Sequence, residues 1–390
     1  MNVFKKINFS GSFDQDGILA KTGISPDDSF MSSADHDFLL GLIEKKRPKK
    51  VLEVGIARGG STLHILDWLV KLGLDDTKVY SVDIDTSPLT GSLIQKGKDW
   101  LPNYNNHKLY TGKIVPEVIE EIGPDVDFCV IDTYHLVPSE LFDFIGVFPF
   151  LAKDAVVVLH DVGKNMRDKC RAEATKLLFD VVVADKYWNW DGEEYPNIAG
   201  FQINDDTKRY IMNVISALGM TWGYNPGSRI LGAYGRFIRK YYSEEAFALY
   251  ENLCKKNIDS LNQRSNKLKQ IFADIICEIS RKEKVYIYGA GNMAHEILRD
   301  TRLRQCISGV VVSDGQAHED DVHGVKVVCI SEVEELEDCL IINSLTRWED
   351  RVEVERELRI RGIKETILNC LNSDQLNDLI NLFDPLFYHA

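Results

Sequence analysis

Apolar and polar positions divide most of the chain into two kinds of segment. From Lys50 onward, short runs rich in Val and Ile alternate with longer segments in which apolar residues recur every three or four positions. The expected strands are VLEVGIA, KVYSVDID, HKLYTG, VDFCVID and AVVVLHDV, and the helices between them include STLHILDWLVKLG and VPEVIEEIG. This alternation is typical of a parallel sheet covered by helices on both faces. We therefore predict a doubly wound α/β domain within residues 1–225, closing with the strand NIAGFQI and the helix DDTKRYIMNVISAL.

A second alternation of strands and helices begins at Val285. It has its own glycine-rich first turn, in VYIYGAG, so we predict a smaller Rossmann-like domain over residues 284–390. Residues 226–283 are predicted to form a helical linker, because apolar residues there repeat at spacings of three and four. This apolar stripe consists of Leu268, Ile271, Phe272, Ile275, Ile276 and Ile279. We expect it to pack either on a neighbouring domain or on a second subunit of a homo-oligomer.

Length and charge exclude several classes of function. The chain of 390 residues exceeds the ~250 to 300 residues at which a single core stops growing, which agrees with two domains. A net charge of −14 disfavours nucleic acid as a partner, because such binding depends on clustered Lys and Arg. No apolar run approaches the ~18 residues of a membrane span, and the N-terminus lacks a signal-peptide pattern. We therefore expect a cytoplasmic protein with no membrane partner.

The eight cysteines are scattered along the chain and form no C-x-x-C pair. Several lie within apolar segments such as DFCVID and KVVCIS. This pattern predicts buried thiols rather than disulfides or a zinc site.

The most informative motif follows the first strand of the N-terminal domain. It reads VLEVGIARGGST and continues directly into an amphipathic helix. Glycines at such a turn let the backbone pass close under a ligand, and the N–H groups at the helix start favour electron-rich groups. Asp83 and Asp85 end the next strand, where a carboxylate can accept both hydroxyls of a ribose. The motif predicts a nucleotide-like ligand contacted by a carboxylate at this strand end, although Asp85 is also interpreted as the start of a turn.

The pattern E-V-G-x-x-x-G-G-S followed by V-D-I-D resembles motifs I and II of class I S-adenosylmethionine (SAM)-dependent methyltransferases. The resemblance implies that Glu53 orients SAM through its amino-acid moiety and that Asp83 binds the ribose. It also implies a cofactor pocket lined by Gly55, Gly59, Gly60 and Ser61.

The ends of two further strands narrow the resemblance to one subgroup of these methyltransferases. The fourth strand runs into VIDTYH, with Asp132 and His135, and the fifth ends in LHDV, with His160 and Asp161. Together they are similar to the I-D-x-x-H and H-D-V pattern of macrocin-type and other sugar or natural-product O-methyltransferases and of cephalosporin hydroxylase-like proteins, over roughly residues 35–205. Methyl transfer to oxygen requires a base beside the methyl group, and His135 and His160 are the candidates. Asp132 is expected to contact both the cofactor and the reacting groups.

Some members of this subgroup bind Mg²⁺ through acids at these strand ends. Here Asp132 and Asp161 could supply two oxygen ligands. The loop often carries a second acid before the histidine, where this chain has Thr133 and Tyr134. Mg²⁺ is therefore an open expectation beside SAM.

The C-terminal domain carries a second candidate site. Gly289, Gly291 and, about 20 residues later, Asp314 match a dinucleotide or nucleotide-sugar fingerprint. An NAD(P)-dependent oxidoreductase, or a nucleotide-sugar-binding protein, acting through this domain is the alternative function, although no Tyr-x-x-x-Lys pair follows the turn. A non-enzymatic scaffold is a third alternative, and it would predict loss of the polar strand ends. The favoured prediction is SAM-dependent methylation of a hydroxyl on a sugar or sugar-like metabolite; N-methylation of a sugar amine would use the same residues.

Overall fold

The computed structural model describes residues 4–5, 31–164, 173–188, 197–279, 281–299, 301–316, 318–333, 339–345, 348–363 and 365–367. The chain divides into two compact units, Met1–Ile258 and Asp259–His389. The boundary falls within one long helix, α11 (Glu244–Ile279). Of the apolar stripe predicted on this helix, Ile279 is buried, and the side chains of the other five residues lie outside the described part.

The first unit is built on an eight-stranded sheet of order β1-β7-β8-β6-β5-β2-β3-β4. Its strands are β1 (Phe4–Lys5), β2 (Lys50–Val54), β3 (Lys78–Asp83), β4 (His107–Thr111), β5 (Val126–Ile131), β6 (Leu151–His160), β7 (Asp185–Trp188) and β8 (Ile198–Gln202). Neighbouring strands are parallel except that β8 runs antiparallel to both β6 and β7. Because β2 lies between β3 and β5, the turn that follows it opens where the direction of strand succession reverses, which is where sheets of this kind bind ligands.

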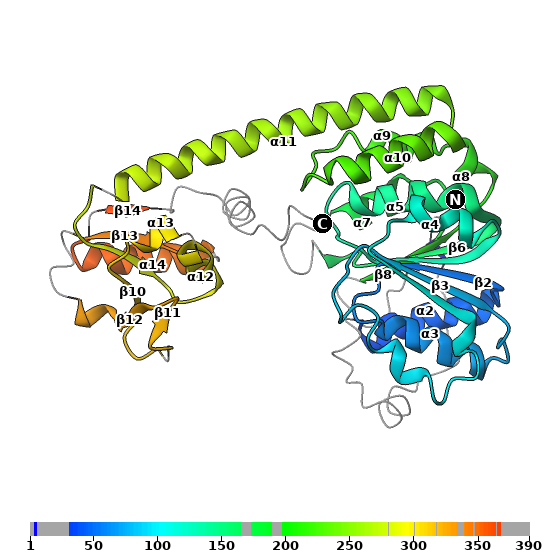
Figure 1. The fold of residues 1–390 in the computed structure, drawn as a ribbon, viewed down its shortest axis with the longest axis horizontal. Helices are drawn as coiled ribbons and strands as arrows, with labels where there is room; N and C mark the ends of the chain where they lie inside the picture. Colours follow the sequence, from blue (N-terminus) through cyan, green and yellow to red (C-terminus); the bar gives the residue numbers. More distant parts are fainter. Residues whose placement is uncertain are drawn as a thin grey trace. The chain divides into compact units, whose positions relative to one another are not determined.

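Helices cover both faces of this sheet, as Figure 1 shows. One face carries α2 (Ser33–Lys46) and α3 (Gly60–Lys71), and the other carries α4 (Val115–Ile122), α5 (Ser139–Val147) and α7 (Ala174–Val181). Beyond the second face lie α8 (Asp205–Arg209), α9 (Met212–Ala217) and α10 (Gly227–Tyr241). The predicted doubly wound, mainly parallel α/β architecture is confirmed for this unit.

Helix α2 begins at a capping box. The Ser32 Oγ accepts a hydrogen bond of 3.2 Å from the Asp35 N–H, and the Asp35 Oδ2 accepts one of 3.0 Å from the Ser32 N–H. Such caps stabilise a helix start by about 1 kcal/mol. The cap also fixes the Asp35 carboxylate, which contacts a residue of the candidate site.

The second unit is built on a six-stranded sheet of order β11-β12-β10-β9-β13-β14. Its strands are β9 (Val285–Tyr288), β10 (Gly309–Val312), β11 (Asp321–Val322), β12 (Val325–Cys329), β13 (Leu340–Asn343) and β14 (Glu365–Ile367). All pairs are parallel except β11 with β12. One apolar cluster joins the sheet to α12 (Asn292–Arg299) and α13 (Thr301–Arg304), and a second joins it to α14 (Trp348–Ile360). This unit is therefore a second parallel-dominant α/β sheet with helices on both faces.

None of the six described cysteines forms a disulfide. Cys129, Cys254 and Cys339 are buried, as predicted, whereas Cys277 is exposed and Cys306 and Cys329 are half-buried. The prediction of burial is therefore wrong for Cys277, because a single apolar neighbourhood in sequence does not fix which side of a long helix a residue occupies.

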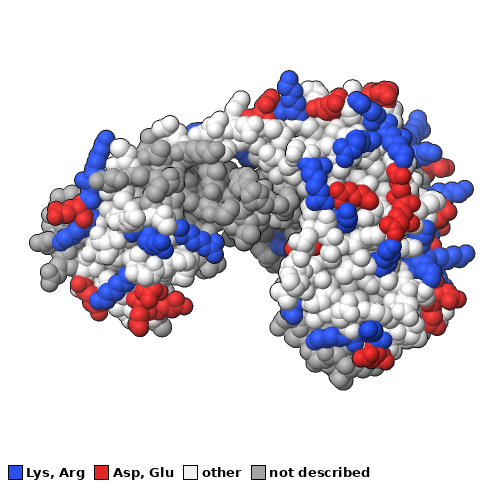
Figure 2. Space-filling model, viewed as in Figure 1, with Lys and Arg blue, Asp and Glu red and all other residues white. Residues whose placement is uncertain are grey.

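Within the described ranges, no helix is both long enough and apolar enough to cross a membrane. On the face shown in Figure 2, Lys and Arg side chains are interspersed with Asp and Glu rather than gathered into one basic surface. Neither observation changes the expected class of partner, a small molecule.

Candidate active site

Gly55 draws three strand ends together at the turn after β2. Its backbone φ of +79° is a left-handed conformation, and a Cβ atom there would lie 1.9 Å from the carbonyl oxygen of Asp132. Its N–H donates to the Val82 carbonyl at 2.9 Å, and the Asp132 N–H donates to the Val54 carbonyl at 2.9 Å. Only glycine satisfies both the conformation and the close approach.

Gly59 and Gly60 lie at the start of the helix that follows the turn. Gly59 is the N-cap of α3 with φ +86°, and a Cβ atom there would lie 2.6 Å from the Ile94 Cγ1. Gly60 is the first residue of α3 and is buried. Gly59 therefore lets the start of α3 pack against the segment after β3.

Glu53 is enclosed beneath the same helix. Its side chain is 1% exposed, and its two oxygens accept hydrogen bonds of 2.5 Å from the hydroxyls of Ser61 and Thr62. Burial raises the pKa of Glu53 to about 7, although these two hydrogen bonds act in the opposite direction. The structure thus turns Glu53 and Ser61 toward each other inside the domain.

Asp83 holds the glycine turn from the end of β3. Its Oδ2 accepts hydrogen bonds from the N–H groups of Ile56 at 2.9 Å and Ala57 at 3.2 Å. Asp85 accepts a hydrogen bond of 2.6 Å from the Thr90 hydroxyl, which confirms its interpretation as the start of a turn. Both carboxylates also line a cavity.

This cavity, of about 310 Å³, opens among the carboxyl ends of β2, β3 and β5 and the starts of α4 and α5. Its volume is within the range of small-molecule sites. The polar lining comprises Asp83, Asp85, Lys113, Asp132, Thr133, Ser139 and Asp143, and the apolar and aromatic lining includes Ile56, Ile84, Ile114, Tyr134, Phe142, Tyr224 and Tyr234. Gly55 belongs to the lining, whereas the described lining residues do not include Glu53, Gly59, Gly60 or Ser61.

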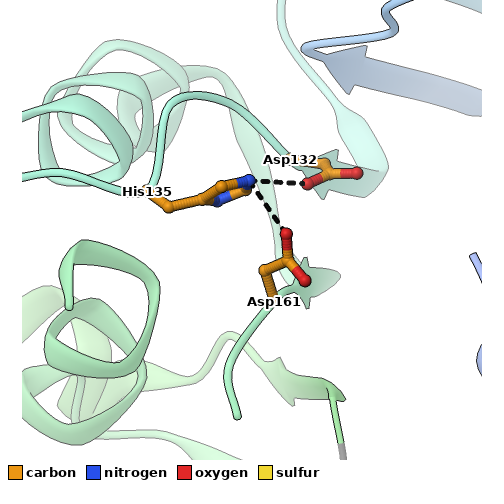
Figure 3. Close-up of side chains that lie close together, drawn as sticks. All are labelled: Asp132, His135 and Asp161. Atoms are coloured by element: carbon orange, nitrogen blue, oxygen red, sulfur yellow. Dashed lines mark ion pairs between the residues drawn. The ribbon is translucent and has the colours of Figure 1, made fainter. Parts of the chain in front are cut away.

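The four polar residues predicted at the ends of β5 and β6 meet beside this cavity. The Nε2 of His135 lies 3.0 Å from the Asp161 Oδ2 and 3.7 Å from the Asp132 Oδ1, the two contacts drawn in Figure 3. The Nδ1 of His160 lies 3.2 Å from the Asp132 Oδ2. Asp132 therefore lines the cavity and also contacts both histidines.

Residues 52–162 match the model of a family described as a methyltransferase domain. That range holds the glycine turn, Asp83 and all four residues of the strand-end cluster. The first unit carries a methyltransferase domain. The prediction of a methyltransferase enzyme is confirmed by this match. No curated protein matches the chain.

Solved methyltransferases are similar to part of this chain at low sequence identity. The similarity to the O-methyltransferase TomG of Streptomyces achromogenes, in complex with SAM, covers 45% of this chain and 82% of the TomG chain. The sequence identity is 14% and the TM-score is 0.38. The O-methyltransferase of Bacillus cereus, in complex with SAH, matches 48% of this chain and 88% of its own at 15% identity and a TM-score of 0.38. Because these TM-scores are below 0.5, the assignment rests on the family match and on the geometry of the site.

Acidic neighbours raise the pKa of His135 in the methyltransferase domain. Its Nδ1 lies 3.1 Å from the Glu140 Oε1. Burial alone would lower its pKa, but hydrogen bonds to Asp161 and Glu140 outweigh burial and raise the pKa to about 9. His135 and Asp161 also adopt left-handed backbone conformations, with φ of 64° and 62°, which concentrate at functional sites when the residue is not glycine.

His160 is more deeply enclosed than His135. Its side chain is 3% exposed, against 14% for His135, and its Nε2 lies 3.5 Å from the Asp35 Oδ2. Burial opposes its protonation, yet the neighbouring Asp132 and Asp35 raise its pKa to about 10. The pKa of Asp161 falls well below its usual range, because His135 and His160 outweigh the effect of burial.

Sequence reasoning missed four acids and amides of this domain. Asp35 and Glu140 contact the two histidines, Asn197 donates to the Asp161 Oδ1 at 2.7 Å, and Asp143 lines the cavity. Only Asp35 had a signal in the sequence, the Ser-x-x-Asp capping box. The others depend on the direction in which a helix face or a preceding loop points.

Asp132, His135 and Asp161 form the one group, among the described residues, whose ligand atoms lie close enough to hold a metal ion. One ligand atom from each lies within 4.8 Å of the other two. The sequence predicted Asp132 and Asp161 for this role, and the structure adds His135 to them.

In the second unit, Gly289 and Gly291 lie in the turn between β9 and α12. Gly289 has φ +95°, and a Cβ atom on Gly291 would meet nothing within 4 Å. Asp314 follows β10 and accepts hydrogen bonds of 3.1 Å from the Ser331 N–H and the Arg361 guanidinium. The three predicted residues thus follow two adjacent strands of the sheet.

Proposed function

We propose that the methyltransferase domain binds SAM in the cavity and transfers its methyl group to a hydroxyl of a sugar or sugar-like metabolite. One observation carries the proposal: Asp132 lines the cavity and contacts His135 and His160 at 3.7 and 3.2 Å. A ligand in the cavity is therefore adjacent to groups that can orient an acceptor and take up its proton.

The residues of the turn support binding of the adenosyl group. Asp83 lines the cavity at the end of β3, where a carboxylate can accept the ribose hydroxyls. Ile84 and Ile114 offer apolar surface to a flat ring. Because Glu53 is enclosed by Ser61 and Thr62, we assign it to support of the turn beneath the cofactor rather than to contact with it.

Methyl transfer is an in-line displacement. The acceptor oxygen forms a bond to the methyl carbon as the bond from that carbon to the sulfonium breaks, so S-adenosylhomocysteine (SAH) leaves and the hydroxyl proton passes to a base. His135 is our candidate for that base, since its side chain is the more exposed of the two histidines. His160, between Asp35 and Asp132, is assigned to holding the Asp132 carboxylate.

A divalent cation fits the donor set of Asp132, His135 and Asp161. Two carboxylates suit a hard cation, and the imidazole nitrogen favours Mn²⁺ over Mg²⁺, which prefers oxygen ligands alone. When bound, such a cation would lower the pKa of an acceptor hydroxyl. In its absence, His135 and Lys164, whose Nζ lies 2.8 Å from the Asp161 Oδ2, balance the charge of that carboxylate.

The test begins with isothermal titration of the full chain with SAM and SAH, with NADH as the control ligand. We expect micromolar binding of both sulfur ligands, and loss of that binding in Asp83→Ala. Transfer of labelled methyl groups from SAM to a panel of sugars, amino sugars and nucleotide sugars, with EDTA or Mn²⁺, then identifies the acceptor. Binding of NADH but of neither sulfur ligand would contradict the proposal.

A second candidate function is nucleotide or nucleotide-sugar binding by the second unit. It is favoured by Asn343, at the end of β13 and in register with Tyr288 of β9, whose buried side-chain N–H₂ has no hydrogen-bond partner among the described residues. A ligand at the glycine turn would supply that partner. Titration of the full chain with UDP-sugars and NAD(P)H, repeated on Gly291→Val, tests it, and the absence of any heat with wild-type protein would overturn it.

A further inference from the structure

The carboxyl ends of β9 and β13 form a second place in the chain where the direction of strand succession reverses. The two strands are parallel neighbours, with Tyr288 opposite Asn343. The chain leaves β9 into α12, which packs on one face of the sheet, and leaves β13 toward α14, which packs on the other. Open α/β sheets bind ligands at such a topological switch point. This switch point belongs to the second unit and uses none of the residues assigned to methyl transfer.

Asn343 carries an unused hydrogen-bond donor at the switch point. Its side chain is fully buried, and its Oδ1 accepts a hydrogen bond of 3.2 Å from the Leu345 N–H. Its side-chain N–H₂ has no hydrogen-bond partner among the described residues. The neighbouring Ser344 differs, since its hydroxyl hydrogen-bonds to the carbonyls of Tyr288 and Gly289 at 2.8 and 3.0 Å. Because a buried donor without an acceptor is costly, a ligand oxygen placed at Asn343 would bind favourably.

The surroundings of this donor suit an anionic ligand. Helix α12 begins directly after the glycine turn, and the N–H groups of a helix start favour phosphate groups. Arg351 of α14 is buried and donates through its Nε to the Leu345 carbonyl, which brings a cation to the segment after β13. That segment lies beside the turn, because a Cβ atom on Gly289 would be 2.9 Å from the Leu345 Cδ2. A Cβ atom on Gly291 would meet nothing within 4 Å, so the turn itself does not block a ligand there.

We infer that Asn343 donates a hydrogen bond to the sugar of a nucleoside diphosphate sugar held at this turn. The inference rests on the second candidate function and names its ligand class. Asp314 follows β10, which lies on the other side of β9 from β13, and a carboxylate there can accept the ribose hydroxyls. With the diphosphate at the start of α12, the group linked to its far phosphate extends toward β13. A hexose offers ring and hydroxyl oxygens there as acceptors for the amide N–H₂.

A dinucleotide fits this sheet less well. In the doubly wound fold, a second nucleotide is bound by a second set of three strands. On that side of β9, the described residues supply only β13 and β14. The second unit therefore favours a single nucleotide that carries a sugar over NAD(P)H.

The experiment is calorimetry on the full chain with matched pairs of ligands: UDP and UDP-glucose, dTDP and dTDP-glucose, GDP and GDP-mannose. The wild type should bind one sugar nucleotide about tenfold more tightly than the corresponding nucleoside diphosphate, the usual effect of one hydrogen bond to a buried group. In Asn343→Ala the two members of that pair should bind within about threefold of each other, because the donor to the sugar is gone. Asn343→Asp keeps an oxygen for the Leu345 N–H but lacks the donor, so it should lose the preference for the sugar as well.

Tyr286→Phe is the matched control. Tyr286 contacts the same apolar cluster as Tyr288 from two residues earlier in β9, and the substitution removes a hydroxyl while leaving the switch point intact. It should keep the ratio of the two affinities at the wild-type value.

A ratio near one for every pair in the wild type, a wild-type ratio that survives in both Asn343 variants, or tighter binding of NAD than of any sugar nucleotide would overturn the inference. If the wild type binds none of these ligands, the second candidate function fails with it, whereas the titrations with SAM test the methyltransferase proposal independently. If Asn343→Ala fails to fold, the ratio in Asn343→Asp decides alone.

Discussion

Replacement of Glu53 by Gln tests the interior of the glycine turn most directly. The substitution keeps the shape of the side chain and removes its charge. Glu53 is 1% exposed, and burial raises its pKa from an ordinary value of 4.5 to about 7. The charged form of this carboxyl is therefore the less stable one in the folded chain.

The sign of the pH dependence follows from proton linkage. Between pH 4.5 and about 7 the folded chain retains a proton on Glu53 that the unfolded chain has released. The free energy of unfolding then falls by about 1.4 kcal/mol per pH unit, or roughly 3 kcal/mol over the interval. The stabilisation is complete below pH 4.5 and is lost as the pH rises through 7. Gln does not titrate, so Glu53→Gln should gain about 3 kcal/mol relative to the wild type between pH 4.5 and 8.

Urea denaturation followed by tryptophan fluorescence measures this difference, because every tryptophan except Trp348 lies in the first unit. The control is Glu120→Gln, an exposed glutamate whose pKa is lowered by a hydrogen bond from Lys240. Removing the charge of Glu120 should slightly lower the free energy of unfolding, the opposite of the effect expected for Glu53→Gln. A stability difference for Glu53→Gln that stays level from pH 5 to 8 would refute the burial argument. If Glu53→Gln instead binds SAH more than about tenfold more weakly than the wild type, Glu53 must contact the cofactor directly.

Three further outcomes are expected. Gly55→Ala should lower the melting temperature more than the control Gly73→Ala, because Gly73 also has a left-handed φ, of 65°, but open space around it. The control should lose only ~1 to 2 kcal/mol through backbone strain, whereas Gly55→Ala should lose a further ~1 to 3 kcal/mol through its steric clash. Equal shifts of the melting temperature in calorimetric scans would contradict the close approach at Gly55. His135→Asn should lower kcat by about 10²- to 10⁴-fold with little change in the KM for SAM, whereas a selective rise in KM would argue against a base. In EDTA-treated protein, kcat should rise with pH toward a midpoint near 9, because His135 must lose its proton before it can accept one, and a flat profile from pH 6 to 10 would exclude that role.

The sequence by itself determined the order of strands and helices and the edge at which the chemistry lies. Runs of Val and Ile too apolar for one exposed face required a sheet buried on both sides. The carboxyl ends of parallel strands meet at one edge, so Asp132, His135, His160 and Asp161 could be grouped from the chain alone.

Only the tertiary structure decided how those residues are used. Glu53 and Ser61 were expected beside the cofactor, but the packing of α3 over β2 turns them inward onto each other. Asp35 reaches the site from α2, which is distant in sequence, and Asp143 from α5, which follows β5 directly; the contacts of both depend on which way each helix face points. A strand end is fixed by local pattern, whereas the rotation of a helix against a sheet is set by long-range packing of many side chains, so the neighbours and pKa values of these carboxyls could not be read from the sequence.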